Sequence, residues 1–274
     1  YHKDLGQYWL KADGKPELLF CDNETNSKRL YNYDDGKPFY KDGINDYLIH
    51  GVNSANPQNT GTKAAINYDV TIPANQSITI RLRLTQDARN TFEDFDTVFK
   101  NRQAEADEFY NTVQQHTSDS DHGMIQRQAF AGMLWSKQYY HYDIHNWLNG
   151  DPKEPQPPIE RLSGRNNRWQ HLNTRAIISM PDKWEYPWFA SWDLAFHCLT
   201  LANVDMAFAK RQLLLLTRDW YMHPNGQLPA YEWDFGDANP PVHAMVAWTI
   251  CKQDKEANDG KGDLRFLERI FHKL

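Results

Sequence analysis

The chain has 274 residues, of which 40% are hydrophobic and 14% aromatic, and its formal net charge is −6 at pH 7. These values describe a globular protein and give no electrostatic reason to expect nucleic acid or an anionic membrane as a partner. No apolar run approaches the roughly 20 residues that span a bilayer. The three cysteines are far apart and odd in number, so neither a disulfide framework nor a zinc cluster is expected. The expected location is cytoplasmic.

The first 88 residues are expected to form a β-rich, sandwich-like domain. Residues 66–72 and 78–84 alternate apolar and polar side chains on either side of a Pro-Ala-Asn-Gln break. This pattern is typical of two antiparallel strands that pair with each other. Upstream clusters of Gly, Asn, Asp and Pro indicate long loops between short strands, as in a sandwich.

The rest of the chain has helical patterns. Residues 89–120 are expected to hold a linking helix, because Phe residues recur on one face of a stretch without Gly or Pro. Within the third part, residues 121–274, a helix is expected to run from Asp121 to about Trp147, where Asn-Gly-Asp-Pro would end it. Three shorter apolar helices, each bounded by Asn, Gly or Pro, are expected at residues 191–203, 206–222 and 240–252.

Residues 182–197, DKWEYPWFASWDLAFH, place three carboxylates among aromatic rings. Ser191 stands where an N-cap is expected, and Asp193 would then be a first-turn residue that merely complements the helix dipole. Alternatively, the rings could form an apolar wall that favours the protonated carboxyl group of Asp193, and repulsion from Glu185 would act in the same direction. The rings in question are those of Trp184, Tyr186, Trp188, Phe189 and Trp192.

A second loop, HPNGQLPAYEWDFGDANPPVHA at residues 223–244, has the same composition. The faces of sugar rings stack on Trp and Tyr, while their hydroxyl groups need acceptors such as carboxylates. Paired carboxylates also suit glycoside hydrolysis. We therefore expect the two loops to face one another across one pocket. The residues expected to bind sugar are Trp188, Phe189, Trp192, Tyr231, Glu232 and Trp233.

Neither a metal nor a cofactor is expected from the sequence. His141 and His145 are four residues apart, but they lack the glutamate of the zinc-protease motif HExxH. Arg161, Arg165 and Arg168 are candidates for a phosphate pocket, but the run RLSGRNNRW is expected to be a solvated loop.

Two long stretches resemble a known catalytic region. DHGMIQRQAFAGMLWSKQYYHYDIHNWLNGDP, at residues 121–152, and the stretch from RNNRWQHLNTRAIISMP to NPPVHA, at residues 165–244, occur in the order found in bacterial members of glycoside hydrolase family 63. This family includes the eukaryotic processing α-glucosidase I. The upstream β-rich part more loosely resembles the end of the family's N-terminal domain. The resemblance implies an α+β chain: the end of a β-sandwich, a linker helix, and the first helical hairpins of an (α/α)6 toroid, incomplete here.

The resemblance also implies inverting hydrolysis of α-glucosidic, or related α-glycosidic, bonds in oligosaccharides or small glycosides. The Trp-Asp of FASWDLAFH aligns with the family's general-acid motif, so Asp193 is expected to be the proton donor. The family's general base is a Glu near the end of the toroid. It is expected to lie beyond this chain, so the missing C-terminal helices are expected partners and the chain alone is expected to be weak or inactive. By resemblance, Glu232 is assigned to sugar binding.

Two other functions stay open. The chain could belong to a carbohydrate-binding or degenerate member that stacks sugars without turnover. It could also belong to a phosphorylase on a similar toroid, which would need a basic or Gly-rich phosphate pocket beside the acid.

Overall fold

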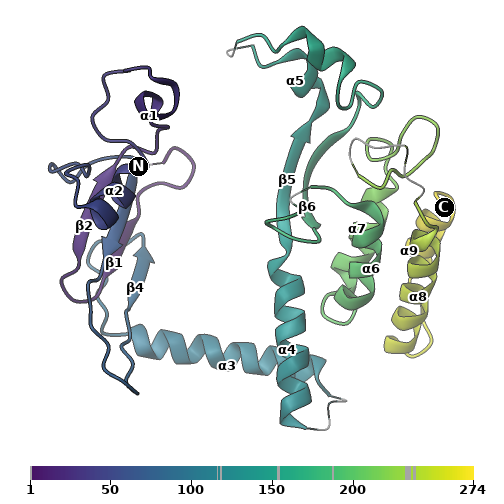
Figure 1. Ribbon diagram of the computed structural model, residues 1–274. Helices are drawn as coiled ribbons and strands as arrows, with labels where there is room; N and C mark the ends of the chain where they lie inside the picture. Colours follow the sequence, from purple (N-terminus) through teal and green to yellow (C-terminus); the bar gives the residue numbers. More distant parts are fainter. Residues whose placement is uncertain are drawn as a thin grey trace. The chain divides into compact units, whose positions relative to one another are not determined.

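The computed structural model describes residues 2–115, 117, 119–152, 155–186, 188–231, 236 and 239–274. The chain divides into two compact units, residues 1–104 and 105–274, and the boundary lies inside helix α3 (Phe95–Val113). Figure 1 shows the elements of both units coloured along the sequence. Among the described residues, none of the helices combines the length and the apolarity needed to cross a membrane.

The first unit contains two small antiparallel sheets. β1 (Trp9–Ala12) pairs with β4 (Leu82–Thr85), and β2 (Glu17–Cys21) pairs with β3 (Lys63–Asn67). The two segments expected to form one hairpin therefore pair with earlier strands and not with each other. Residues 68–81, all of them described, contain no strand.

The first unit has a small core and an uncovered apolar stretch. Between β2 and β3 lie α1 (Ser27–Tyr31) and α2 (Gly43–His50), and Ile44 of α2 packs against Leu19 and Cys21 of β2. In contrast, the alternating apolar side chains between β3 and β4 are 43–51% exposed; they are Val70, Ile72, Ile78 and Ile80. Because strand preference reflects burial against neighbours, alternation without a covering layer does not produce a strand.

The second unit begins with α3 and continues in α4 (Ser120–Trp135). The side chain of Asp119 caps α4 by accepting hydrogen bonds from the backbone N–H groups of Asp121 and His122, at 3.0 and 2.9 Å. The helix ends at Trp135, so the prediction of a helix continuing to Trp147 is wrong. Residues 137–143 form a strand and residues 144–149 a short separate helix.

The hairpin of β5 (Lys137–Asp143) and β6 (Asn173–Ser179) explains this difference. The strands pair in full, from Lys137 opposite Ser179 to Asp143 opposite Asn173. Three Tyr residues within seven positions favour a strand once a partner is available. That partner lies 30 residues further along the chain, beyond α5 (Ile144–Asn149) and the 3-10 helix η1 (Ile159–Ser163), so local spacing does not reveal it.

The hairpin is fixed to the helices by a buried cluster and by one polar side chain. The cluster joins residues of α5, β6, the start of α6 and the end of α7; its largest members are Trp169, Tyr221, Phe189, Leu172, Ile178, Met180, Leu194 and Leu216. Gln212 of α7 is buried as well. Its Oε1 accepts the N–H of Ser179 at 3.2 Å and its Nε2 donates to the carbonyl of Ile177 at 2.9 Å, so β6 is tied to α7.

Four helices complete the second unit: α6 (Ser191–Leu201), α7 (Met206–Leu216), α8 (Val242–Ala257) and α9 (Leu264–Phe271). Their apolar faces share a second core that includes Ala195, Leu213, Val246 and Ile270. The three helices predicted in this part are confirmed, with α7 shorter and α8 longer than expected. The mixture of helices and small sheets is consistent with the α+β class. The described helices do not close a ring, so the toroid stays a prediction.

A partly buried ion cluster joins α7, α8 and the start of α9. The side chain of Lys210 is 12% exposed, and its Nζ lies 2.7 Å from Asp254 and 3.1 Å from Asp263. Burial opposes the charge on Lys210, but hydrogen bonds to the two carboxylates outweigh burial and raise its pKa. Asp263 also caps α9 by accepting the N–H of Phe266 at 2.9 Å. The positive charge of Lys210 therefore compensates the negative charges of both Asp254 and Asp263.

Replacing Lys210 should destabilise this unit. Lys210→Met leaves two carboxylates close together without a cation, and we expect a loss of about 2–4 kcal/mol in the free energy of unfolding at pH 7. Lys261→Met, on an exposed residue, is the matched control and should stay within about 0.5 kcal/mol of wild type. Urea denaturation measures both. Equal effects of the two variants would contradict a structural role for the cluster.

Candidate functional site

The segment from Met180 to Ala190 connects the end of β6 to the start of α6. Asp182 shapes its first turn by accepting the backbone N–H groups of Glu185, at 2.8 Å, and of Trp184, and these bonds lower the pKa of its carboxyl group. The side chain of Trp184 is 91% exposed. At the other end the ring of Phe189 is fully buried, 5.5 Å from that of Tyr221. Phe189 thus anchors the segment just before α6, whereas the turn at Trp184 is exposed to solvent.

The start of α6 is joined to the second aromatic loop. Ala190 and Tyr231 form an antiparallel bridge, and the N–H of Ser191 donates to the carbonyl of Ala230 at 3.0 Å. The hydroxyl of Ser191, which is fully buried, donates to the carbonyl of Pro229 and accepts the amide of Asn239 at 3.3 Å. Ser191 is the first residue of α6, Ala190 is the N-cap, and the hydroxyl of Ser191 bonds across to the other loop.

This contact places the described parts of the two predicted sugar-binding loops side by side. The amide of Asn239 also donates to the carbonyl of Leu228 at 3.0 Å, which closes the base of the second loop. Glu232 and Trp233 lie outside the described residues, as do Asp234, Phe235 and Asp237. Tyr231, which is half-buried, is described, and it bridges to Ala190 just before α6.

Asp193 lies in the first turn of α6, as predicted, and its side chain is half-buried. Leu194 and Ala195, which follow it, are fully buried and fix the rotation of the helix about its axis. Backbone N–H groups at a helix N-terminus attract negative charge in general. The placement agrees with a dipole partner and equally with a proton donor.

His197 follows Asp193 by one helical turn, and its side chain is half-buried. Its Nδ1 lies 3.0 Å from the hydroxyl of Ser179, the last residue of β6. Burial lowers the pKa of His197, while the negative charge of Asp193 and hydrogen bonding with Ser179 partly oppose that change. A histidine that stays neutral at pH 7 adds no positive charge beside Asp193. The β5–β6 hairpin therefore contacts His197 of α6 through Ser179, and His197 lies one helical turn from Asp193.

The aromatic side chains around Asp193 do not form the single wall that was expected. Trp192 is 38% exposed and its ring tilts against that of Phe196, with centroids 6.3 Å apart. Trp188 packs edge-on against Tyr186, at 5.1 Å. Phe189 belongs to the core, and Trp184 projects into solvent. The rings of Trp192 and Tyr186 are thus partly open to a ligand, whereas that of Phe189 is not.

A second histidine of this region is buried more deeply. His243 lies in the first turn of α8, directly after the second loop, and is only 4% exposed. Its Nε2 has no hydrogen-bond partner in the part of the chain that the structure describes. Burial lowers the pKa of His243 to about 4. This imidazole is consequently neutral at pH 7.

Sequence reasoning missed Ser179, His197, Asn239 and His243 at this site. The spacing of four residues between Asp193 and His197 on one helix is a signal that could have found His197. Ser179 and Asn239 reach the site only through strand pairing and loop closure. Among the described residues, no group of three or more His, Cys, Asp or Glu side chains could hold a metal ion.

Comparison with known proteins bears on this region directly. Residues 186–274 match the family model of a mannosylglycerate hydrolase MGH1-like glycoside hydrolase domain. This part of the chain is similar to a glycoside hydrolase. The match includes Asp193 and α6 to α9.

A yeast protein aligns with nearly the whole chain. The uncharacterized protein YMR196W of Saccharomyces cerevisiae is 47% identical over 277 aligned residues, which cover 96% of this chain and 25% of the yeast protein. The chain thus spans about a quarter of the length of this relative. No solved structure matches. Membership of family 63 specifically, a bacterial origin and a cytoplasmic location stay predictions.

Removing the hydroxyl of Ser191 should loosen the junction of the two loops. Ser191→Ala leaves the carbonyl of Pro229 without its donor and takes one acceptor from Asn239, so we expect a loss of about 1–3 kcal/mol in unfolding free energy. Thr249→Ala is the control, because that exposed hydroxyl only donates to a carbonyl of its own helix, at 2.9 Å. Amide hydrogen exchange at position 191, whose N–H donates to the carbonyl of Ala230, should rise in the first variant alone, and no rise there would contradict the junction.

The buried imidazole of His243 should make the protein less stable in acid. Below about pH 6.5 the unfolded chain takes up a proton at this residue, while the folded chain resists protonation until about pH 4. Stability should therefore fall as the pH falls from 6.5 to 4, by about 3 kcal/mol from this residue.

His243→Leu should flatten that part of the pH profile measured by urea denaturation. The control is His272→Leu, which changes an exposed ring at the end of α9 and should keep the wild-type slope. If the slopes of the wild type and of His243→Leu were the same, His243 would not be the cause.

Proposed function

We propose that this chain carries the general-acid half of an inverting glycosidase that cleaves α-glucosidic, or related α-glycosidic, bonds. The observation that carries the proposal is the position of Asp193: first turn of α6, inside the region similar to a glycoside hydrolase domain, and next to Ala190, which bridges to Tyr231. In this proposal the proton donor and the residues that bind the sugar lie together at the N-terminus of α6. The inversion of configuration and the α-glycosidic bond type in this proposal come from the resemblance to glycoside hydrolase family 63.

In the proposed reaction, protonated Asp193 gives its proton to the glycosidic oxygen as the bond from that oxygen to the anomeric carbon breaks. A carboxylate elsewhere in the full-length protein removes a proton from the water that attacks the opposite face of the sugar. The products are a hemiacetal of inverted configuration and a free alcohol. Asp193 is left as a carboxylate, which the N-terminus of α6 stabilises, while neutral His197 places no competing cation beside it.

The proposed sugar-binding residues follow from exposure. Trp192 offers ring surface one residue before Asp193, Trp188 is half-buried against Tyr186, and Tyr231 lies across the bridge from Ala190. Glu232 and Trp233 are proposed by resemblance alone. Phe189 supports the loop from within the core, because its ring is buried against Tyr221.

No observation favours phosphorolysis. Two of the three arginines considered for a phosphate pocket are engaged with aromatic rings: the guanidinium of Arg161 lies 3.9 Å from the ring centre of Trp147, and that of Arg165 lies 5.5 Å from the ring centre of Tyr142.

The test is Asp193→Asn in the full-length protein. Asn keeps the shape of the side chain but cannot donate a proton as an acid does, so kcat on an unactivated α-glucoside should fall about 10²–10⁴-fold. An α-glucosyl fluoride needs little protonation of its leaving group and should recover much of the lost rate. Glu185→Gln, on an exposed carboxylate of the same loop, is the control and should keep wild-type kcat on both substrates.

Thermal melting separates chemistry from folding in this comparison. If Asp193 only complements the helix dipole, Asn should cost about 0.3–1 kcal/mol of stability and leave turnover near wild type. Equal losses of kcat on the unactivated α-glucoside and on the α-glucosyl fluoride, or no loss on either substrate, would show that Asp193 is not the acid.

A further inference from the structure

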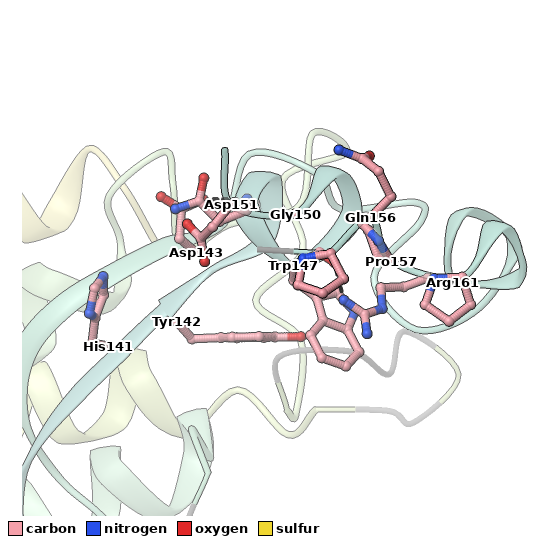
Figure 2. Close-up of a pocket in the computed structure, with 12 residues that line it drawn as sticks. His141, Tyr142, Asp143, Trp147, Gly150, Asp151, Gln156, Pro157 and Arg161 are labelled. Atoms are coloured by element: carbon pink, nitrogen blue, oxygen red, sulfur yellow. Dashed lines mark hydrogen bonds between the residues drawn. The ribbon is translucent and has the colours of Figure 1, made fainter. Parts of the chain in front are cut away.

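The second unit has a surface hollow at the end of the β5–β6 hairpin where Asp143 pairs with Asn173. It is formed by the end of β5, the helix α5, and the Pro-rich stretch that leads into η1, and its volume is about 560 Å³. This volume falls within the roughly 300–1,000 Å³ of small-molecule sites. Figure 2 shows its lining, with the rings of Tyr142 and Trp147 between two carboxylates at one end and Arg161 with Gln156 at the other.

The aromatic floor of this hollow is held in place before any ligand arrives. The rings of Tyr142 and Trp147 lie 6.5 Å apart. The guanidinium of Arg161 stacks on Trp147 and its Nη1 donates to the Trp147 carbonyl at 2.9 Å. Trp147 nevertheless stays 36% exposed. Arg161 covers one face of this indole, so the part of the ring that stays exposed is the part that can contact the apolar face of a sugar.

The polar groups of the hollow are also oriented. Asp143 accepts the N–H of Asn146 at 3.2 Å and the side-chain amide of Asn173 at 2.8 Å, which fixes its carboxylate at the start of α5. Asp151 lies beside it in Figure 2. Among the described lining residues, two carboxylates stand against one guanidinium, a balance that disfavours phosphate and other anions. Acceptors at one end and a donor at the other match the hydroxyl groups of a neutral sugar.

This hollow is separate from the region of Asp193. Asn173, which bonds Asp143, is the first residue of β6, and Ser179, which contacts His197, is the last. Six residue steps along a strand span about 20 Å. A ligand at Trp147 therefore does not occupy the position of a sugar cleaved at Asp193.

We propose that the hollow around Tyr142, Trp147 and Arg161 is a non-catalytic binding site for a neutral saccharide chain, remote from Asp193. The choice of a saccharide rests on the proposed function, whereas the site itself rests on its own geometry. Its role is to hold part of a long substrate while another part reaches α6.

Binding without turnover tests the site. Maltoheptaose is titrated into the full-length Asp193→Asn protein by calorimetry, with Trp147 intact or changed to Ala. We expect Trp147→Ala to raise Kd about tenfold, the loss typical of an aromatic anchor. Trp220→Ala is the matched control, because Trp220 is also partly exposed and carries a guanidinium, that of Arg218, 5.3 Å from its ring centre. It should leave Kd within about twofold.

A second variant protects the test against misfolding. Gln156→Ala removes an exposed hydrogen-bonding group at the rim and should weaken binding severalfold without lowering the melting temperature. The proposal is overturned if both Trp variants weaken binding equally or neither does, or if Gln156→Ala binds as the parent does. It is also overturned if phosphate or tetramethylammonium binds at the Trp147-dependent site more tightly than maltoheptaose. A Trp147-dependent Kd together with unchanged turnover of Asp193→Asn would sink the catalytic proposal and leave this one standing.

Discussion

The second unit depends on the buried hydroxyl of Ser191. A helix normally begins with its first N–H groups satisfied by a local cap or by water. Here the first residue of α6 instead directs its N–H and its hydroxyl to Ala230 and Pro229, and Asn239 completes the junction. The start of α6 and the base of the aromatic loop before α8 are therefore fixed together. Asp193, two residues further along, takes its position from this junction and not from the long loop that precedes it.

Local patterns in the sequence were enough to find the elements that carry the candidate acid. The apolar spacing of α6, α7 and α8 and the first-turn position of Asp193 follow from neighbours within a few residues. The β5–β6 hairpin could not be found in this way, because Tyr139, Tyr140 and Tyr142 fit a helix end or a strand until β6 is available as a partner. The stretch between β3 and β4 failed for the opposite reason. Its alternation is real, but the described chain supplies no layer to cover it.

The same limit applies to the candidate site. Aromatic residues near a carboxylate indicated a sugar site, yet composition does not distinguish a ring that faces solvent from one that faces the core. Phe189 and Trp192 are three residues apart, yet Phe189 is fully buried and Trp192 is 38% exposed. Ser179 and Asn239 come from segments whose approach to α6 is set by tertiary packing. Such residues are visible only once the pairing of strands and loops is known.

Gln212 gives these contacts a consequence for dynamics. Its amide bonds two backbone groups of β6, so the hairpin cannot separate from α7 without leaving buried polar groups unpaired. Ser179 belongs to the same pair of contacts and also touches His197, beside the candidate acid. Groups linked in this way open and close as one cooperative unit in the native state. The first turn of α6 should therefore share the opening free energy of the hairpin, which gives the candidate acid near the surface the rigidity of the core.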